Sequence, residues 1–305
     1  MPSKLLTMSD AIARFVHDGD SVAIGCALEP LIPFAAAHEI IRQRRRDLTL
    51  IGPISDILFD QLIGAGCVAR VVAAWAGNVS AGLGHAYRRA AEQGIPRPID
   101  IRDHSNFSIA LALHAAALGA PFIPARTLLG SDIATNAPDL IVAPSPLDGS
   151  PLLLVPALIP DVAVVHVQRA DAEGNAHAWG NLGICQEAAL AAQRVIVVAE
   201  EIVAPEVIRS DPNRVLVPGF KVAAVVHARG GAHPSPVQGY YNRDHAFFQE
   251  YHVATRTHTG TEAWLAEWVY GVDGRAAYLA KLGAEHWRAL APRRSLPAAP
   301  VDYGY

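Results

Sequence analysis

Two histidines and two acids lie close together in the stretch VVHVQRADAEGNAHAWGN, 164–181. Imidazole and carboxylate side chains can bind a metal ion or transfer protons. The ligands of one metal ion must converge, and short spacings on one helix face achieve this. Ten residues separate His166 from His177, and turn-forming residues lie between them, so we expect no metal site here.

The turn lies in Asp-Ala-Glu-Gly-Asn, 171–175. Asp171 can accept hydrogen bonds from the amides that follow it, and Gly-Asn tolerates a positive φ. We therefore predict a tight turn directly after a buried strand. This would place His166 at the carboxyl end of that strand, which is the end where open α/β sheets build their binding sites.

Three loops carry small polar residues that are suited to holding an anion. They are AGNVSAG (76–82), DHSNF (103–107) and LLGSDIA (128–134). Backbone amides in such loops form anion-binding nests, and the side chains add further donors. In the first two loops, capping of the following helix is the alternative role. The candidate binding residues are Asn78, Ser80, Ser105, Asn106, Gly130, Ser131 and Asp132.

Other acids and one histidine also follow expected strands. Glu200 and Glu201 end a buried strand and could do acid–base work, but we favour a helix-cap or interface role for them. Glu29, just beyond the first strand, could reach the same cleft, although loop acids are usually solvated. We expect His233 in GGAHPSP to pack or form hydrogen bonds within its loop.

The composition is that of a packed, soluble α/β protein. The chain has 305 residues, of which 51% are hydrophobic and 18% charged. The net charge is −4, and the basic cluster at 42–47 resembles the solvated end of a helix, so we expect no nucleic-acid partner. Three cysteines without a CxxC pair indicate reduced, buried thiols in the cytoplasm. We expect no signal peptide and no membrane contact.

The elements that must position these residues alternate between strand-like and helix-like segments. This alternation predicts an open, mainly parallel sheet with helices on both faces. Helix 108–121 is apolar almost all round, so we expect it to be buried. The segment 140–158 predicts a hairpin or an antiparallel patch on the sheet. The other expected strands are 21–25, 48–52, 68–75, 161–168 and 194–201. The other expected helices are 33–44, 55–66 with Ser55 or Asp56 as its cap, and 80–94 with a stop at Gly94.

Amphipathic helices follow Gly260, at 261–271 and 275–290. Their aromatic side chains need a surface to cover, and we expect a partner protein to provide it, with the chain's own sheet as the alternative. We predict one domain, 1–290, and a flexible C-terminal tail, 291–305. The aromatic residues are Trp264, Trp268, Tyr278 and Trp287.

Several stretches resemble the first subunit of family I CoA-transferases, in particular of the glutaconate CoA-transferase type. The most specific is GGAHPSPVQGYYNRD (230–244), and MSDAIARFVHDGDSVAIG (8–25) and HVQRADAEGNAHAWG (166–180) add to it. One departure follows the first expected strand, where the family usually has Gly-Gly-Phe and Gly25 here is followed by Cys26-Ala27. This bears on acyl-group preference more than on fold. The resemblance implies the α/β fold of a CoA-transferase subunit, no permanently bound cofactor, and a coenzyme A thioester as substrate.

The implied reaction moves CoA between carboxylic acids. A glutamate attacks the acyl-CoA thioester and then carries the CoA until a second carboxylate releases it, which splits one hard step into easier ones. In the family this glutamate belongs to the second subunit, in a Ser-Glu-Asn-Gly setting that is absent from this chain. The resemblance therefore implies no catalytic nucleophile here, a homologous second subunit as partner, and acyl-CoA and small carboxylic acids as ligands.

A pocket for a dicarboxylate needs an arginine or an amide nest that faces the distal carboxylate. Arg126, just before the third loop, is the arginine that we expect to bind it. The alternative is that Arg126 pairs with Asp132 or Asp103 and only holds the loop.

Not all relatives of this first subunit are transferases. Some are hydrolases that open a ring in steroid-derived CoA thioesters, and others are decarboxylases. The hydrolase branch uses a glutamate of the first subunit, in the segment leading into the helix that ends here at Gly119. This chain has no glutamate between Glu92 and Glu173, although Asp103 or Asp132 could substitute. A non-catalytic scaffold subunit is a further alternative.

Overall fold

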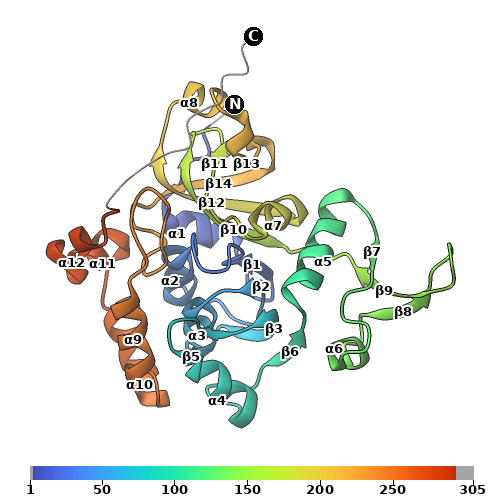
Figure 1. Ribbon diagram of the computed structural model, residues 1–305. Helices are drawn as coiled ribbons and strands as arrows, with labels where there is room; N and C mark the ends of the chain where they lie inside the picture. The colour runs from blue at the N-terminus through green and yellow to red at the C-terminus, as the bar shows by residue number, and fades with distance from the viewer. Residues whose placement is uncertain (1–2, 293–305) are drawn as a thin grey trace.

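A nine-stranded sheet forms the centre of the computed structural model, which describes residues 3–292 (Figure 1). The short strands β11 (Ala176–His177) and β13 (Val215–Val217) join it by antiparallel pairing. The other strands are parallel, so the predicted open, mainly parallel sheet is confirmed. In spatial order they are β14 (Val222–His227), β12 (Arg194–Ile202), β10 (Val162–Ala170), β1 (Ser21–Ile24), β2 (Leu48–Ile54), β3 (Val68–Trp75) and β6 (Asp100–Asp103).

Alternate side chains of the parallel strands enter two hydrophobic cores, one on each face of the sheet. In β10, Val164 lies in one core and Val165 in the other. Because both faces are covered, the strands carry near-continuous apolar runs rather than alternating patterns. Helices α1 (Met8–Phe15), α2 (Phe34–Arg42) and α3 (Ile57–Gly64) cover the first face, and α5 (Asn106–Leu118) and α7 (Cys185–Ala191) contribute to the second.

One helix is shorter than expected. Helix α4 (His85–Gln93) begins after Ser80, because β5 (Gly82–Leu83) first pairs with β4 (Gly77–Asn78) in a small hairpin. The predicted stop at Gly94 is confirmed, and this glycine adopts the left-handed conformation that ends many helices.

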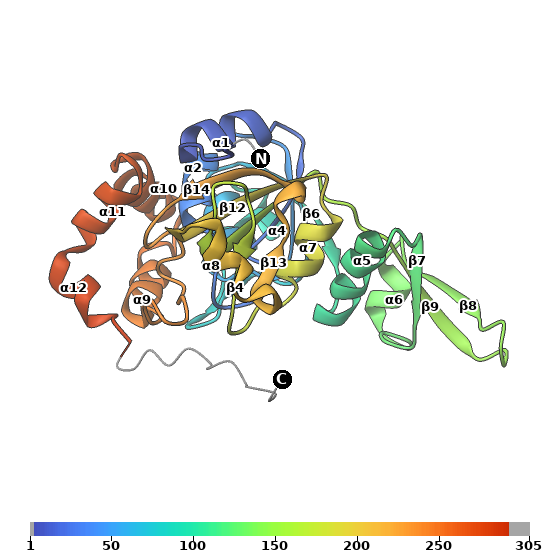
Figure 2. The same cartoon turned by 90° about the horizontal axis from the view of Figure 1, so that it is seen from above.

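A side lobe, defined here as residues 106–158, projects from the body of the molecule (Figure 2). The predicted hairpin is confirmed, but it pairs with a third strand in a separate sheet, so the patch on the main sheet is wrong. Helix α5 at its base is covered on one side only, and Phe107 and Leu118 are exposed, which contradicts the expected full burial. The lobe also contains β7 (Phe122–Ala125), α6 (Asp132–Asn136), β8 (Ile141–Pro144) and β9 (Pro151–Pro156).

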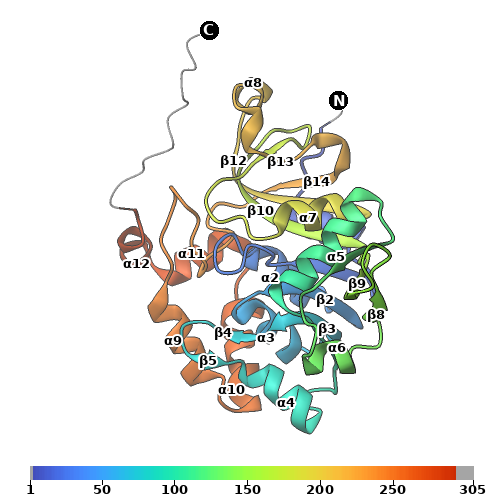
Figure 3. The same ribbon diagram turned by 45° about the vertical axis from the view of Figure 1, so that its right-hand side comes forward.

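The C-terminal helices pack against α2 and α3, on the side of the molecule away from the side lobe (Figure 3). Trp264 is buried and its ring meets Phe247 and Tyr251, while Trp268 meets Tyr278. The expectation that a partner covers these aromatic residues is therefore wrong for Trp264 and Tyr278, since the chain's own core does so. The helices are α9 (His245–Ala254), α10 (His258–Leu265), a π-helical turn (Ala266–Tyr270), α11 (Gly274–Leu282) and α12 (Ala284–Ala289).

Two further expectations concern the chain as a whole. Cys26, Cys67 and Cys185 are buried and unpaired, as predicted. Among the helices of residues 3–292, none has the length and apolar character needed to span a bilayer. The tail beyond residue 292 lies outside the described residues.

Candidate active site

The loops that follow β1, β2, β3 and β14 meet at one edge of the sheet, because parallel strands all end on the same side. The Leu31 amide donates to the Pro236 carbonyl at 3.1 Å, and the Ala35 amide donates to the Gly231 carbonyl at 2.9 Å. The Ser235 hydroxyl donates to the Glu29 carbonyl. The loop after β1 and the loop after β14 are thus bonded together into one rim.

Strained backbone gathers at this rim. Leu28, Leu31 and Asp56 have φ angles of 75°, 54° and 48°, which lie in the left-handed region that residues other than glycine rarely adopt. Gly25 has φ 72°, and a Cβ there would lie 2.8 Å from the Ser55 side chain, so only glycine fits. Such strain persists only where the surrounding structure enforces it, and it clusters at functional sites.

Asp56 and Arg243 form a buried ion pair at the centre of the rim. Asp56 caps α3, as one of the two expected caps, and its Oδ1 accepts from the amides of Ile57 and Val79. Its Oδ2 accepts from Arg243 Nη2 at 2.6 Å. Burial raises the pKa of Asp56, and the Arg243 guanidinium opposes this. The pair therefore ties the loop after β2 to the segment after β14.

Ser80 and Phe248 fix the Arg243 guanidinium in place. Ser80 Oγ accepts from Arg243 Nε at 3.2 Å and from Nη2 at 2.9 Å. The guanidinium carbon lies 3.8 Å from the centre of the Phe248 ring. Glu29 approaches from the rim, with its Oε2 3.9 Å from Arg243 Nη1. The arginine is thus held on three sides and faces one half-exposed carboxylate on the fourth.

Glu200 lies in a buried network behind the rim. Its carboxylate accepts from His166 Nε2 at 2.8 Å, from the Tyr241 hydroxyl at 2.6 Å and from the Gly230 amide at 2.7 Å. Burial pushes the pKa of Glu200 upward, but these bonds outweigh it and hold the pKa low. The expected helix-cap or interface role is wrong for Glu200, since its partners join two strands to the loop after β14.

His166 also lies elsewhere than expected. It sits within β10 rather than at its end, because the strand continues to Ala170 before the turn. The turn itself is confirmed, with Asp171 Oδ1 accepting from the amides of Glu173 and Asn175. His177 is buried and bonds to the Ile208 carbonyl, so the two histidines of this stretch share no site.

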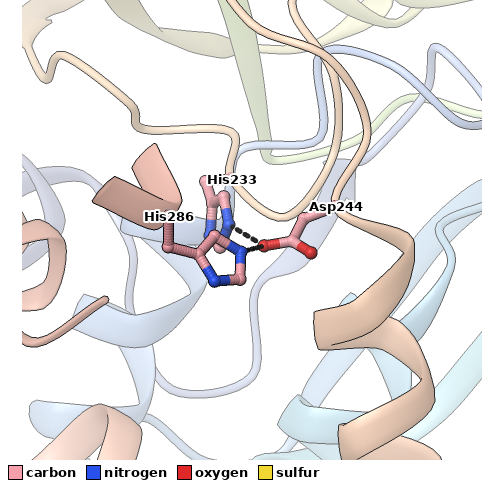
Figure 4. A group of neighbouring side chains, drawn as sticks. All are labelled: His233, Asp244 and His286. Carbon is pink, nitrogen blue, oxygen red and sulfur yellow. Dashed lines mark hydrogen bonds and ion pairs between the residues drawn. The ribbon is translucent and has the colours of Figure 1, made fainter. Parts of the chain in front are cut away.

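A second buried cluster joins His233, Asp244 and His286 (Figure 4). Both histidines donate through Nε2 to the same carboxylate oxygen, at 2.9 Å for His233 and 2.5 Å for His286. The Tyr278 hydroxyl donates to His233 Nδ1 at 2.9 Å. The expected structural role of His233 is confirmed, but its side chain bonds outside its own loop, so the cluster fastens α9, α12 and the GGAHPSP loop together.

The ligand-capable atoms of this cluster lie within 4.8 Å of one another. A tetrahedral zinc ion with bonds of about 2.0 Å would separate its ligands by roughly 3.3 Å. The 2.5 Å contact from His286 to Asp244 is shorter than that and fits a charge-assisted hydrogen bond instead. The cluster therefore has the geometry of a polar clamp, and the absence of a metal site stays a prediction.

Two of the expected binding residues, Asn78 and Ser80, lie in the rim, and Ser105 and Asn106 follow the neighbouring strand β6. Asn78 is buried, donates to the Phe248 carbonyl and accepts from the Ser80 amide, so it shapes the loop that carries Ser80. Ser105 caps α5 through a mutual pair of bonds with Ser108, and Asn106 follows as an exposed first residue of that helix. The capping alternative is thus confirmed for Ser105, while substrate contact by these residues stays a prediction.

The other expected residues lie in the side lobe. Ser131 caps α6 and Asp132 begins it, while Gly130 turns the chain with φ 79°. Arg126 is 72% exposed and lies 3.8 Å from Asp148 in the β8–β9 hairpin. The alternative pairing of Arg126 with Asp132 or Asp103 is therefore wrong, and the structure gives this arginine no buried surroundings.

The sequence reasoning missed Arg243 and underrated Asp56. Arg243 stands inside the most specific stretch, GGAHPSPVQGYYNRD, directly before the Asp244 cap of α9. Its position between a glycine-rich loop and a helix cap could have indicated Arg243 as a candidate site residue. Its partner, however, lies 187 residues away in sequence, which no local pattern reveals.

Comparisons with known proteins identify the family and the fold of this chain. The family model for coenzyme A transferase matches residues 5–228. The first subunit of a 3-oxoadipate CoA-transferase from Pseudomonas knackmussii is 41% identical over 280 residues, covering 92% of this chain and 98% of that protein. The solved glutaconate coenzyme A-transferase from Acidaminococcus fermentans has a TM-score of 0.88 and 34% identity, covering 94% of this chain and 95% of that one.

A relative with different chemistry is more distant. The cholesterol ring-cleaving hydrolase IpdA subunit of Mycobacterium tuberculosis is 30% identical over 286 residues, covering 90% of this chain and 95% of that protein.

Proposed function

From the premise that this chain belongs to the coenzyme A transferase family, as the first of its two kinds of subunit, we propose that it is half of a heteromeric CoA-transferase. The partner carries the glutamate that holds CoA as a thioester between the two half-reactions. The acyl groups are dicarboxylic, since two of the relatives are named for 3-oxoadipate and glutaconate.

The observation that supports a partner-borne nucleophile is the engagement of the rim carboxylates. A nucleophile must be free to attack the thioester. Asp56 is fixed by two amides and Arg243, and Glu200 by three donors behind the rim. Glu29 is half-exposed and is not hydrogen-bonded to Arg243, 3.9 Å away, so the adduct experiment below tests it separately. The chain therefore supplies the walls of the site, and the reacting carboxylate comes from outside.

The chain's own contribution is binding and charge stabilisation. The strained connection between β1 and α2 presents backbone near the carboxyl ends of the strands, where amide donors stabilise the oxyanion that forms during acyl transfer. Arg243 adds a fixed positive charge at the same rim. Because these groups are already held, little reorganisation is needed when charge develops on the thioester oxygen.

The side lobe supports assembly with a partner. Phe122, Ile141, Val142 and Leu147 are exposed on it. Apolar side chains gathered on one projecting element are typical of a surface that becomes covered in a complex.

The test uses the chain co-purified with its second subunit, the product of the neighbouring gene. The complex is incubated with an acyl-CoA and a free carboxylate, and transfer is followed by chromatography. Peptide mass spectrometry then locates the covalent CoA adduct. We expect transfer by the complex and the adduct on the second subunit. Turnover by the lone chain, or an adduct on Glu29, would overturn the proposal.

The hydrolase alternative is separated by the same assay. At the start of α5, where that branch uses a glutamate, this chain has the Ser105 cap and an exposed Asp103. We therefore expect CoA to pass to an acceptor carboxylate rather than to be released by water. Free CoA formed without any acceptor would favour the hydrolase.

A further inference from the structure

Arg243 is firmly held and keeps one nitrogen without a hydrogen-bond partner. Its Nε and Nη2 donate to Ser80 and Asp56, and Phe248 supports the guanidinium plane. Its Nη1 is buried and has no hydrogen-bond partner among residues 3–292. A buried charged donor left unpaired is unfavourable, and such an atom in a native site calls for a functional explanation.

Glu29 is the carboxylate nearest to that nitrogen, but it does not bond to it. The separation of 3.9 Å is beyond hydrogen-bonding range. The Glu29 side chain is 52% exposed, so it can swing away without disturbing the core. Such loosely held surface pairs contribute little free energy. An incoming carboxylate can therefore replace Glu29 at Nη1 without breaking any strong contact.

A cavity of about 330 Å³ lies between the loop after β1 and the segment after β14. Its lining includes Pro30 and Asn242, the immediate chain neighbours of Glu29 and Arg243, and also Trp179 and Gly239. This volume lies in the range of pockets that enclose small ligands. The rim thus offers room for a short acyl chain between the two segments that carry Glu29 and Arg243.

We propose that Arg243 Nη1 binds the distal carboxylate of a dicarboxylyl-CoA substrate, and that Glu29 covers this position in the free protein. This rests on the proposed function and names the residue that selects the substrate class. Nη1 would donate one charge-assisted hydrogen bond to the carboxylate while Nε and Nη2 keep their contacts with Ser80 and Asp56, and a lysine ammonium cannot make all of these contacts at once.

Selectivity follows from the same geometry. A dicarboxylyl group gives Nη1 an acceptor and leaves Glu29 free to be hydrated. A monocarboxylyl acyl chain of equal length would push Glu29 aside and offer no acceptor in its place. Sites built to hydrogen-bond a substrate group reject analogues that lack it, because their own buried polar atoms remain unpaired.

The experiment measures kcat/KM of the two-subunit complex for glutaryl-CoA and butyryl-CoA. For Arg243→Lys, we expect a loss with both substrates, because lysine cannot keep the Ser80 and Asp56 contacts, and we expect the loss with glutaryl-CoA to exceed that with butyryl-CoA by roughly 10- to 100-fold. Glu29→Gln removes the competing charge, so KM for glutaryl-CoA should fall while butyryl-CoA is little affected. Arg88→Lys, at an exposed arginine of α4, is the matched control.

Equal losses with both substrates for Arg243→Lys would mean that the arginine only holds the rim, and this would overturn the inference. The same holds if Arg126→Lys discriminates and Arg243→Lys does not. If Arg243→Lys fails to fold, Glu29→Gln decides, because an unchanged KM ratio refutes the covering role. A wild-type complex that transfers CoA from neither substrate would instead refute the proposed function.

Discussion

At the scale of single residues, buried polar side chains hold the site together. Glu200 and Asp244 each accept several hydrogen bonds from groups that are far apart in the chain. A buried carboxylate is stable only when such donors replace water. These residues therefore connect the loops of the rim to the sheet, and their protonation affects the stability of the whole fold.

The His233–Asp244 pair makes stability fall in acid. Burial lowers the pKa of His233 from 6.5 to about 4, although Asp244 opposes this. The unfolded chain then binds more protons between these values, so stability drops as pH falls from 6.5 to 4, by roughly 3 kcal/mol. Burial alone would raise the pKa of Asp244, but bonds from His233, the Phe247 amide and His286 bring it from 3.8 to about 2. Protonation of Asp244 therefore causes a further loss of folding stability as pH falls below 4.

Urea unfolding at pH 7, 5.5 and 4.5 measures this slope. His233→Asn should flatten it, whereas His114→Asn, at an exposed position on α5, should not. Parallel slopes for wild type and His233→Asn would contradict the linkage.

Glu200→Gln should lower the free energy of unfolding by roughly 3–5 kcal/mol, the usual effect of breaking one side of a buried charged pair. The amide would place its own N–H groups against the His166, Tyr241 and Gly230 donors. Glu201→Gln is the matched control, because Glu201 is exposed although it directly follows Glu200. It should change stability by less than about 0.5 kcal/mol. Comparable effects of the two variants in urea titrations would show that the network is not stabilising.

Zinc should not stabilise the His233–Asp244–His286 clamp, because its 2.5 Å contact leaves no space for an ion between the donors. Differential scanning fluorimetry with one equivalent of Zn²⁺ should give an unchanged Tm. A rise in Tm that is abolished by His286→Ala would instead identify a metal site.

At the scale of elements, the C-terminal helices belong to the core. Trp264 of α10 packs against α9 through Phe247 and Tyr251. Helix α5 shows the opposite behaviour, since its apolar surface is only partly covered by this chain. An apolar stripe in the sequence therefore does not reveal which surface covers it.

Trp264→Ala should reduce the free energy of unfolding by roughly 3–5 kcal/mol, as expected for a large buried aromatic side chain. Leu118→Ala, at a site that is 65% exposed on α5, should change the stability of the lone chain by less than about 0.5 kcal/mol. Chemical denaturation of both variants provides the comparison. A small effect of Trp264→Ala would mean that α10 docks weakly.

At the scale of the whole molecule, the family places this chain in a two-subunit enzyme. Light scattering of the co-purified complex should give a mass well above that of the 32.4 kDa chain. We expect this because the exposed apolar side chains of the side lobe are stabilised when a partner surface buries them. A chain that remains monomeric in the presence of the second subunit would count against the two-subunit assembly.

The sequence by itself determined what depends on neighbouring residues. The parallel sheet followed from the alternation of strand-like and helix-like segments, the 171–175 turn from Asp and Gly-Asn chemistry, and the Asp56 cap from its place before an apolar helix. These features are local, because hydrophobic period, turn and cap preferences act over a few residues.

Only the tertiary structure decided which charged residues meet. Arg126 and Arg243 both follow glycine- or proline-containing segments, yet one is exposed in the side lobe and the other is buried against Asp56. The difference arises because the long segment after β14 runs back from its end of the sheet to the loop after β1 and to Asp56 after β2, although these strands are not neighbours in the sheet. Burial then turned Glu200 from an expected cap into the centre of a network. Such meetings depend on non-local packing, which no local pattern encodes.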